Sequence, residues 1–339
     1  MATPGQSGME AAYAAWAAVA MVSSPDVQAV GEGGPSDPFA AGTPAFVALL
    51  REIGQSLGLG EAEPGVPSLL SAQDPAEVIA FSPRADAFVT LYRGPTVADI
   101  AAVQALHGAN MGSHAGDDRY VLSPDDPQIV ALWDAGGVDT IDLSAFTRGC
   151  AVELAPGRYS TLAFDGMDPM HALGIARGAR IENAVGGGGD DRLRGSGADN
   201  RLDGGAGDDR LSGAGGADVL VGGAGRDVLR GGAGADAFVF AQGDLAGRTA
   251  RGADVILDFA AVQGDRIDLS GIDADARAEG DQAFAFLGGA RFDGHAGELR
   301  AVAQGSGLLL LGDVNGDGRA DMAVRLAGVS QIEAMDFVL

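Results

Sequence analysis

The chain has 339 residues, and its 22 basic residues, all of them arginine, stand against 47 acidic ones, which gives a formal net charge of −25 at pH 7. Such a balance speaks against nucleic acid and anionic membrane as partners and favours metal ions or a polycation. The length allows two or more domains, and the single cysteine, Cys150, excludes an internal disulfide. An extracellular form would therefore draw stability from another source, of which bound calcium is the obvious candidate.

An apolar run extends from Ala11 to Val22, but no basic residue precedes Arg51. The positively charged first part of a secretory signal peptide is therefore missing, and the run is too short to cross a bilayer. We expect no membrane span.

Two helices are expected in the first part of the chain. Thr43 and Pro44 form a helix start, and apolar residues at helical spacing predict an amphipathic helix near residues 44–57. A second helix near residues 96–110 contains His107, which we interpret as a packing or capping residue. Cys150 has no recognisable catalytic partner and is interpreted as a small strand residue. The buried face of the first helix would carry Phe46, Leu49, Leu50, Ile53 and Leu57.

Six nonapeptides follow one another from Gly186 to Val239, each close to G-G-x-G-x-D-x-(Leu/Phe)-x. This is the pattern of RTX calcium-binding repeats. Glycines let a six-residue loop turn tightly and aim its carbonyl oxygens inward, where the acidic side chain at position six joins them in an all-oxygen site suited to calcium. The apolar position eight would point into a parallel β-roll, and it is occupied by Leu193, Leu202, Leu211, Leu220, Leu229 and Phe238.

Two repeats make one coil of 18 residues, so loops on the same edge of the roll should lie above one another. A flexible linker is the alternative, but it would not place an apolar residue at every ninth position, and a phosphate-binding loop needs one glycine turn between a strand and a helix. The neutral Asn200 predicts a weaker site. We expect Asp191, Asp209 and Asp227 on one edge and Asn200, Asp218 and Asp236 on the other, with backbone ligands at Gly186, Gly188, Gly204 and Gly222.

Short strands are predicted at 237–240, 254–259, 266–269, 283–287, 307–311 and 321–326, and they indicate an antiparallel sheet after the roll. One of the turns carries oxygen-bearing side chains at alternating positions, as calcium loops do: Asp313, Asn315, Asp317 and Asp321. A hairpin turn would have a similar sequence, and the EF-hand glutamate is absent, so both interpretations stay open. The last four residues, an acidic one followed by three apolar ones, resemble the carboxy-terminal end of type I secretion substrates.

From about Thr96 to Leu339 the chain resembles the carboxy-terminal part of the serralysin family, which are calcium-dependent secreted metalloproteases. The resemblance is carried by residues 98–110 (ADIAAVQALHGAN), 132–143 (LWDAGGVDTIDL), 181–187 (IENAVGG), the repeats, and 265–269 (DRIDL). In that family the Trp-Asp-x-Gly-Gly-x-Asp stretch and the glutamate before the repeats bind calcium, which implies ligands at Asp134, Asp139 and Glu182. Arg180 stands where the family usually has a threonine ligand. An ordinary capped turn is the alternative for the two aspartates.

The family's zinc helix has the pattern HExxHxxGxxH, and residues 51–61 fit this frame without its histidines. Arg51, Gln55 and Glu61 occupy the three ligand positions, while Glu52 is kept. Arginine has no lone pair to give, and one carboxylate with one amide does not make a zinc site. The segment 88–92 matches the family's methionine turn, with Thr90 at the methionine and Tyr92 at the zinc-proximal tyrosine. About 50 residues precede the helix, too few for the upper half of a protease cleft.

The sequence therefore predicts a mainly β protein: a parallel β-roll of RTX repeats with a C-terminal antiparallel sheet, preceded by a small helical remnant of a protease domain. We place the remnant at 1–116, a β entry at 117–185, the roll at 186–239, and the C-terminal sheet with the secretion signal at 240–339. No catalytic residue is assigned, and several calcium ions but no zinc are expected.

The predicted function is that of a secreted bacterial calcium-binding protein, a pseudoprotease that leaves the cell through a type I (ABC transporter) apparatus and folds when it meets calcium. Two alternatives stay open. One is an active zinc metalloendopeptidase of the same family, and the other is a calcium-dependent surface or matrix adhesin.

Overall fold

The computed structural model describes residues 44–60, 68, 79–82, 87–91, 94–244, 252–275 and 277–339. Two compact units make up the chain: Met1–Ala145 with Leu154–Ile181, and Phe146–Glu153 with Glu182–Leu339. The predicted division into remnant, entry, roll and C-terminal sheet stays a prediction. In the described part of the chain, no helix combines the length and the apolar composition that crossing a bilayer takes.

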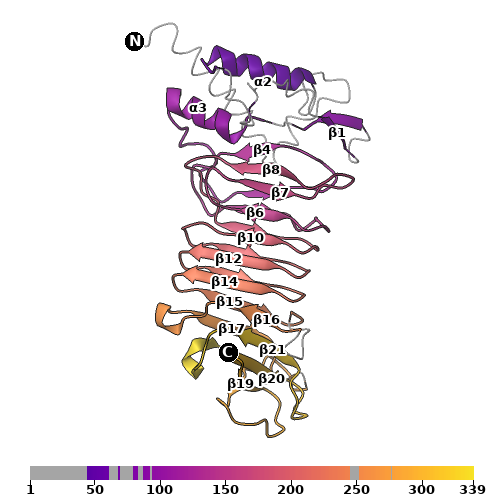
Figure 1. The fold of residues 1–339 in the computed structure, drawn as a ribbon, viewed down its shortest axis with the longest axis vertical. Helices are drawn as coiled ribbons and strands as arrows, with labels where there is room; N and C mark the ends of the chain where they lie inside the picture. The colour runs from indigo at the N-terminus through magenta and orange to yellow at the C-terminus, as the bar shows by residue number, and fades with distance from the viewer. Residues whose placement is uncertain are drawn as a thin grey trace. The chain divides into compact units, whose positions relative to one another are not determined.

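The first unit contains both expected helices (Figure 1). Helix α2 spans Pro44–Ser56, and its residues Val47 and Leu50 are buried, as is Leu57 just after it. Helix α3 spans Val97–His107 and begins with a capping box, in which Thr96 and Asp99 satisfy each other's backbone N–H groups. The side chains of Phe46 and Leu49 lie outside the described part of the chain.

Helices α2 and α3 are joined by a small apolar core and by a contact of His107. A small core joins Leu57 and Leu59 to Val103 of α3, with Ile53 packed against it. Beside this core, the His107 Nε2 atom lies 3.0 Å from the carbonyl oxygen of Leu57, an oxygen left over where α2 ends. This contact agrees with the interpretation of His107 as a capping residue.

The strands of the first unit form three small groups. β1 (Ile79–Ser82) and β2 (Ala87–Thr90) are antiparallel. β3 (Arg119–Val121) runs parallel to β5 (Thr140–Asp142), and β4 (Val130–Leu132) runs parallel to β8 (Met170–Ile175). β7 (Tyr159–Leu162) pairs with β8 in the antiparallel sense. Strand β2 covers most of the segment compared with a methionine turn, and Tyr92 lies outside the described residues.

The second unit is a parallel β-roll, as predicted. Successive strands alternate between two sheets, and partners within a sheet are one coil apart, as in Leu193↔Leu211↔Leu229 and Leu202↔Leu220↔Phe238. These six side chains are at most 2% exposed, so they form the core of the roll. One sheet holds β6 (Ala151–Glu153), β10 (Arg192–Arg194), β12 (Arg210–Gly215), β14 (Val228–Ala233) and β16 (Asp254–Ile256); the other holds β9 (Asn183–Val185), β11 (Arg201–Asp203), β13 (Val219–Val221), β15 (Ala237–Ala241) and β17 (Arg266–Gly271).

Glycine is required in the loops by both conformation and space. Gly225 has a φ of 143°, which residues with a side chain rarely adopt. A Cβ atom on it would also collide with the carbonyl oxygen of Gly207 in the preceding coil. The coils can therefore stack at the spacing of a β-sheet only while residue 225 is glycine.

The C-terminal strands differ in one respect from the prediction. β19 (Glu298–Gln304), β20 (Gly307–Asp313) and β21 (Met322–Leu326) are antiparallel, but β16 and β17 pair in parallel with the roll and extend it. The prediction of an antiparallel sheet from residue 237 onward was therefore wrong for these two strands. It was also wrong for β15, which pairs in parallel with β13 and β17, and for the short strand at 285–286, which pairs in parallel with β19. β16 and β17 continue the apolar ladder, with Ile256 beside Leu229 and Ile267 beside Phe238.

Strand β19 was not predicted, because glutamate and alanine, which make up three of its seven residues, are depleted in strands. Two further short strands complete the described set. β18 (Ala285–Phe286) pairs with β19, and β22 (Phe337–Val338) pairs in parallel with β17. The ring of Phe337 contacts that of Phe286, 4.9 Å between centroids, so the end of the chain is part of the core.

Candidate metal-binding site

A ladder of aspartates follows each edge of the roll. On one edge, the backbone N–H of Asp191 donates to Oδ1 of Asp209 over 2.7 Å, that of Asp209 to Asp227 over 2.8 Å, and that of Asp227 to Asp254 over 2.8 Å. On the other edge, Asp218 donates to Asp236 over 3.0 Å. The structure thus places the predicted residues on the predicted edges, and each carboxylate is oriented by the amide of the coil before it.

In five of the ladder aspartates the second carboxylate oxygen has no such partner, whereas Oδ2 of Asp191 accepts from the backbone N–H of Gly187. Their side chains are 0–2% exposed, so the oxygens are also shielded from water. Leaving a carboxylate oxygen buried and unpaired is costly, and such groups are normally paired or bound to a metal. Among the described residues, the Oδ2 atom lacks a hydrogen-bond donor in Asp209, Asp218, Asp227, Asp236 and Asp254.

Four of these oxygens, those of Asp209, Asp218, Asp227 and Asp236, lie in a space that a glycine leaves open. A Cβ atom added to Gly204 would collide with Oδ2 of Asp209 and would lie 2.5 Å from the carbonyl oxygen of Gly222. The same holds at Gly213, where the collision is with Oδ2 of Asp218. A carboxylate oxygen and a carbonyl oxygen from the next coil therefore converge on one position, and oxygen donors of this kind suit a hard cation such as calcium. The donor set present fits the ion that the repeats imply.

Burial and mutual repulsion change the proton affinity of the ladder. Burial raises the pKa of Asp209, Asp218, Asp227 and Asp254 to about 7, and neighbouring aspartates add to the effect. Burial likewise raises the pKa of Asp191. A bound divalent cation would reverse this effect, since it favours the ionised carboxylates.

Asn200 interrupts the ladder chemically but not geometrically. Its Oδ1 accepts from the backbone N–H of Ser196 over 2.7 Å, and its Nδ2 donates to the carbonyl oxygen of Glu182 over 2.9 Å. The side chain is neutral and satisfied by the protein itself, which agrees with the expectation of a weaker site there. Glu182, 8% exposed, is the first residue of the longer segment of this second unit.

Two members of the ladder, Asp254 and Asp265, were not singled out as ligands from the sequence. Asp265 accepts from the backbone N–H of Asp236 over 3.1 Å, as Asp254 does from Asp227. The signal was available, because both begin the pattern Asp-x-apolar found at positions six to eight of the repeats other than that of Asn200. It was missed because these aspartates are 27 and 29 residues beyond their partners and not 18.

The first unit contains a second acidic cluster. Carboxylate oxygens of Asp118, Asp134 and Asp139 lie within 4.8 Å of one another. Tyr120 donates its hydroxyl to Oδ2 of Asp134 over 2.6 Å, and the backbone N–H of Asp118 donates to Oδ1 of Asp139 over 2.8 Å. Burial raises the pKa of Asp134. Asp118 was missed from the sequence, because only the pairing of β3 with β5 brings it to Asp139.

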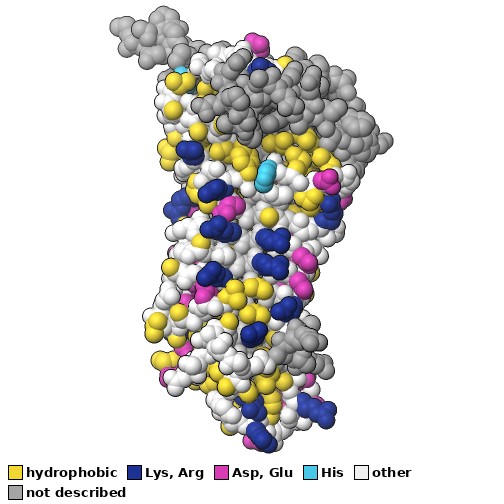
Figure 2. Space-filling view, viewed as in Figure 1, with side chains coloured by type: hydrophobic (Ala, Val, Ile, Leu, Met, Phe, Trp, Pro, Cys, Tyr) yellow, Lys and Arg dark blue, Asp and Glu magenta, His cyan; other side chains and the backbone are white. Residues whose placement is uncertain are grey.

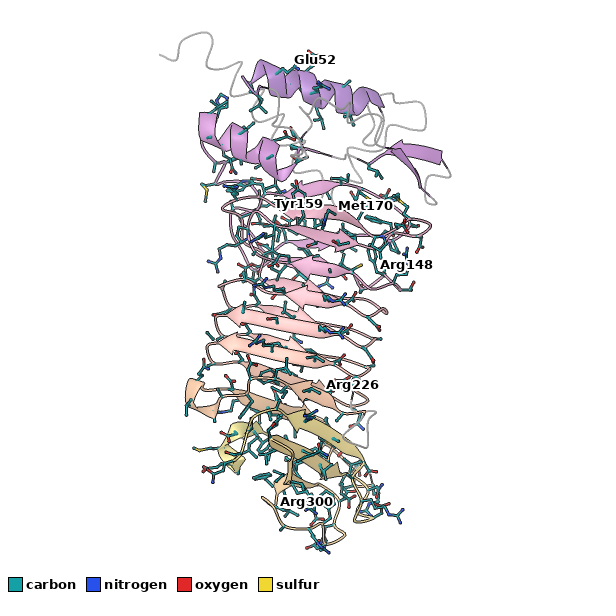
Figure 3. The ribbon with its side chains drawn as sticks, viewed as in Figure 1. Glu52, Arg148, Tyr159, Met170, Arg226 and Arg300 are labelled. Atoms are coloured by element: carbon teal, nitrogen blue, oxygen red, sulfur yellow. The ribbon has the colours of Figure 1, made fainter. Side chains whose placement is uncertain are left out.

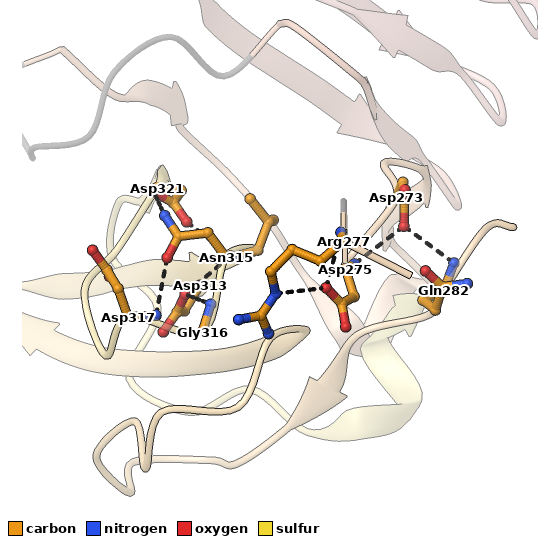
Figure 4. A network of polar contacts seen from close by, with 10 residues as sticks. Asp273, Asp275, Arg277, Gln282, Asp313, Asn315, Gly316, Asp317 and Asp321 are labelled. Carbon is orange, nitrogen blue, oxygen red and sulfur yellow. Dashed lines mark hydrogen bonds and ion pairs between the residues drawn. The ribbon is translucent and has the colours of Figure 1, made fainter. Parts of the chain in front are cut away.

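The loop from Asp313 to Asp321 is closed by its own hydrogen bonds (Figure 4). Asp313 accepts from the N–H of Gly316 over 2.6 Å and from that of Gly318 over 2.7 Å. Asn315 donates to Asp321 over 2.9 Å and accepts from the N–H of Asp317 over 2.9 Å. These contacts are what a capped hairpin turn makes, so calcium binding at this loop stays a prediction.

The segment compared with a zinc helix is helix α2. Glu52 is exposed on it (Figure 3). Gln55 is exposed as well and Arg51 is half-buried, while Glu61 lies outside the described residues. Within the described part of the chain, the groups of metal-ligating side chains that converge are Asp118–Asp134–Asp139 and Asp293–His295–Glu298, and neither includes a residue of α2.

The sequence model for the serralysin C-terminal domain of the M10 peptidases matches residues 102–339. The chain belongs to this family. It is 40% identical over 253 residues to the metallopeptidase AprA of Pseudomonas marginalis, covering 70% of this chain and 48% of that protein. Serralysin G of Dickeya chrysanthemi is 36% identical over 172 residues, covering 44% of this chain and 35% of that protein. This serralysin-related chain thus spans about half the length, or less, of these relatives.

Similarity to solved structures is weaker. The R3 subunit of the mannuronan C5-epimerase AlgE6 from Azotobacter vinelandii is 30% identical, with a TM-score of 0.30, covering 44% of this chain and 78% of that one. The extracellular lipase LipA of Serratia marcescens is 20% identical, with a TM-score of 0.31, covering 66% of this chain and 37% of that one. The fold is established by the strand pairing described above and not by these structures.

Proposed function

We propose that this protein is a secreted calcium-binding β-roll protein whose roll folds when calcium binds between stacked loops. The observation that carries the proposal is the row of buried Oδ2 atoms without hydrogen-bond donors, of which those of Asp209 and Asp218 lie beside a carbonyl oxygen of the next coil. In this arrangement Asp209 and Asp227 hold calcium on one edge, with Asp191 and Asp254, and Asp218 and Asp236 hold it on the other. The glycine carbonyls, among them that of Gly222, supply the remaining oxygens.

Calcium supplies the positive charge that the stacked carboxylates lack. Without it, the roll must bury aspartates that are partly ionised at neutral pH and repel one another along both edges. Extracellular calcium modules bind at about 0.1–1 mM, far above cytosolic calcium. A chain of this kind stays unfolded and threadable through a type I secretion apparatus inside the cell and folds outside it.

Helix α2 supports the further proposal that the region before the roll is not a zinc protease. Arg51 cannot ligate a metal, and Gln55 offers only a weak amide ligand. These residues do not fit zinc, so we derive no catalytic step from them. Calcium at Asp118, Asp134 and Asp139 and at residues 313–321 belongs to the same proposal of a noncatalytic calcium-binding protein.

Circular dichroism of the full chain in chelator and in millimolar calcium tests the proposal. We expect a largely unfolded spectrum in chelator, a β spectrum in calcium, and little effect of the same concentration of magnesium, which prefers smaller octahedral sites. Identical spectra in chelator and calcium would overturn the calcium-driven folding. If the proposal is correct, metal analysis of the dialysed protein should also give several equivalents of calcium and no zinc.

The names of the relatives favour a second candidate, a metalloendopeptidase, since the Pseudomonas proteins are a metallopeptidase and a metalloprotease. One equivalent of zinc retained after dialysis, together with chelator-sensitive cleavage of casein, would support this candidate. Glu52→Gln is the matched variant: it should abolish cleavage by a zinc enzyme and change nothing in a noncatalytic protein.

A further inference from the structure

Four arginines lie together on the outer surface of one sheet of the roll. In β10, β12 and β14 the central residue, Leu193, Leu211 or Leu229, points into the core, so the residues on either side of it face outward. The register places Arg192 of β10 directly beside Arg210 of β12. Figure 2 shows dark blue side chains gathered over these strands. We call this group, made of Arg192, Arg194, Arg210 and Arg230, the arginine surface.

Only part of this positive charge is neutralised by the protein. Arg194 lies 3.5 Å from Glu153 and Arg230 lies 3.3 Å from Asp258. Arg192 and Arg210 are exposed, and no ion pair involves either of them among the described residues. Like charges on directly opposed strand positions repel each other, so this pair gains when an anion lies between the two guanidinium groups.

The nearest exposed acids in sequence do not fill this role. Asp190 and Asp208 precede the two arginines by two residues. Asp190 accepts through Oδ1 from the backbone N–H of Asp208 over 2.9 Å, and Asp208 likewise from that of Arg226 over 3.0 Å. The backbone of the next coil thus holds these carboxylates in the loops.

The opposite sheet has no such surface in the described part of the chain. Its outward positions beside Leu202, Leu220 and Phe238 hold Arg201 and Asp203, followed by Val219, Val221, Ala237 and Val239. There, Arg201 and Asp203 interact electrostatically within one strand. The excess of arginine is therefore a property of one face and not of the repeat itself.

We infer that the arginine surface binds a linear acidic polysaccharide that carries carboxylate or sulfate groups. Strands in a sheet are about 4.8 Å apart and outward residues of one strand about 6–7 Å, so the surface offers a flat, narrow row of guanidinium groups along the roll. Guanidinium groups bind carboxylate and sulfate oxygens through paired hydrogen bonds. A thin polymer can lie along this row, and the negative charge elsewhere on the protein is screened beyond about 8 Å at physiological ionic strength.

Nucleic acid fits less well. Binding of single strands relies on aromatic side chains on which bases stack, and the outward positions of β10, β12 and β14 hold arginine, serine and valine. A duplex presents a wide, dense array of phosphates that a surface only two outward residues wide does not match. The surface therefore favours a slender sugar polymer over nucleic acid.

Binding of dextran sulfate to the full chain in millimolar calcium tests this inference. We expect saturable binding that weakens with added salt, no binding of unsulfated dextran, and weaker binding of oligothymidylate. The double variant Arg192→Gln/Arg210→Gln should lose at least tenfold in affinity. Arg201→Gln, on the opposite sheet, is the matched control and should lose less than twofold.

A second variant separates recognition from bulk charge. Arg192→Lys/Arg210→Lys keeps both charges but loses the paired hydrogen bonds, and it should bind between the parent and the glutamine variant. Circular dichroism in calcium establishes that each variant is folded. Absence of binding by the parent, equal losses for the two faces, or tighter binding of oligothymidylate would each overturn the inference, and none of them would affect the calcium-folding proposal, which is read from the chelator experiment.

Discussion

The backbone N–H of Asp209 donates to Oδ1 of Asp227, which lies one coil further along the roll, over 2.8 Å. The hydrogen bond fixes the carboxylate so that its other oxygen lies beside Gly222, buried and without a donor. Each coil thus positions the metal-ligating group of the next, and a substitution of one aspartate should weaken calcium binding at the adjacent sites as well.

Replacing Asp227 by asparagine removes one negative charge and keeps the acceptor for the Asp209 amide. Calcium affinity in such sites follows the number of charged ligands, so we expect the calcium concentration at the folding midpoint to rise by about three- to tenfold. A calcium titration followed by circular dichroism measures this. Asp208→Asn, at the exposed neighbouring position, should leave the midpoint nearly unchanged, and an equal shift in both variants would contradict the assignment.

The ladder also predicts that acid partly replaces calcium. The pKa values of Asp209, Asp218, Asp227 and Asp254 are raised from 3.8 to about 7 in the fold, so between these limits the folded chain binds more protons than the unfolded chain. The stability of the calcium-free roll should therefore rise as the pH falls from 7 toward 4, and this contribution is lost as the pH rises through 7.

Circular dichroism in chelator at pH 5 and at pH 7.5 measures the effect. More β structure is expected at pH 5, and the same step in pH should weaken calcium binding because protons compete for the carboxylates. A chelated chain that is equally unfolded at both values would show that burial of these carboxylates is not what opposes folding.

Gly204 keeps open the space in which a carboxylate and a carbonyl oxygen meet. Gly204→Ala places a methyl group there, and we expect a loss of about 1–3 kcal/mol in the free energy of unfolding in calcium, as for other overpacked positions. The result would be a lower Tm and weaker calcium binding. Gly197→Ala is the matched control, since its Cβ would have no atom within 4 Å, and a similar loss there would argue against a specific site.

Tyr120 is expected to support the acidic cluster of the first unit. Tyr120→Phe removes the donor to Asp134 and leaves a buried carboxylate oxygen unsatisfied, at a cost of about 1–3 kcal/mol. A double-mutant cycle with Asp134→Asn separates this contact from general packing. We expect the effects of the two changes on the Tm in calcium to be non-additive. Additive effects would contradict a supporting role of Tyr120 in the acidic cluster.

The parts of the fold that repeat were predictable and the parts that join them were not. A fixed nine-residue period gives both the strand positions and the two edges, so Asp191 and Asp218 could be assigned to opposite sides without coordinates. Asp254 was not predicted as a ligand, because the chain between it and Asp227 is longer than one coil and a fixed repeat length does not include such an insertion. Asp118 was not predicted for a different reason. It lies beside Asp139 only because β3 pairs with β5, and strand pairing depends on packing over the whole unit.

The link from Asp227 to Asp254 has the same 2.8 Å hydrogen bond as the link from Asp209 to Asp227, although 27 residues separate the first pair and 18 the second. Ile256 still pairs with Leu229 after the longer excursion. The stack therefore accepts additional chain between coils without losing register. A foreign peptide or a small domain could be inserted at such a junction. The roll would then serve as a scaffold in which the inserted segment changes while the calcium-dependent folding of the coils does not.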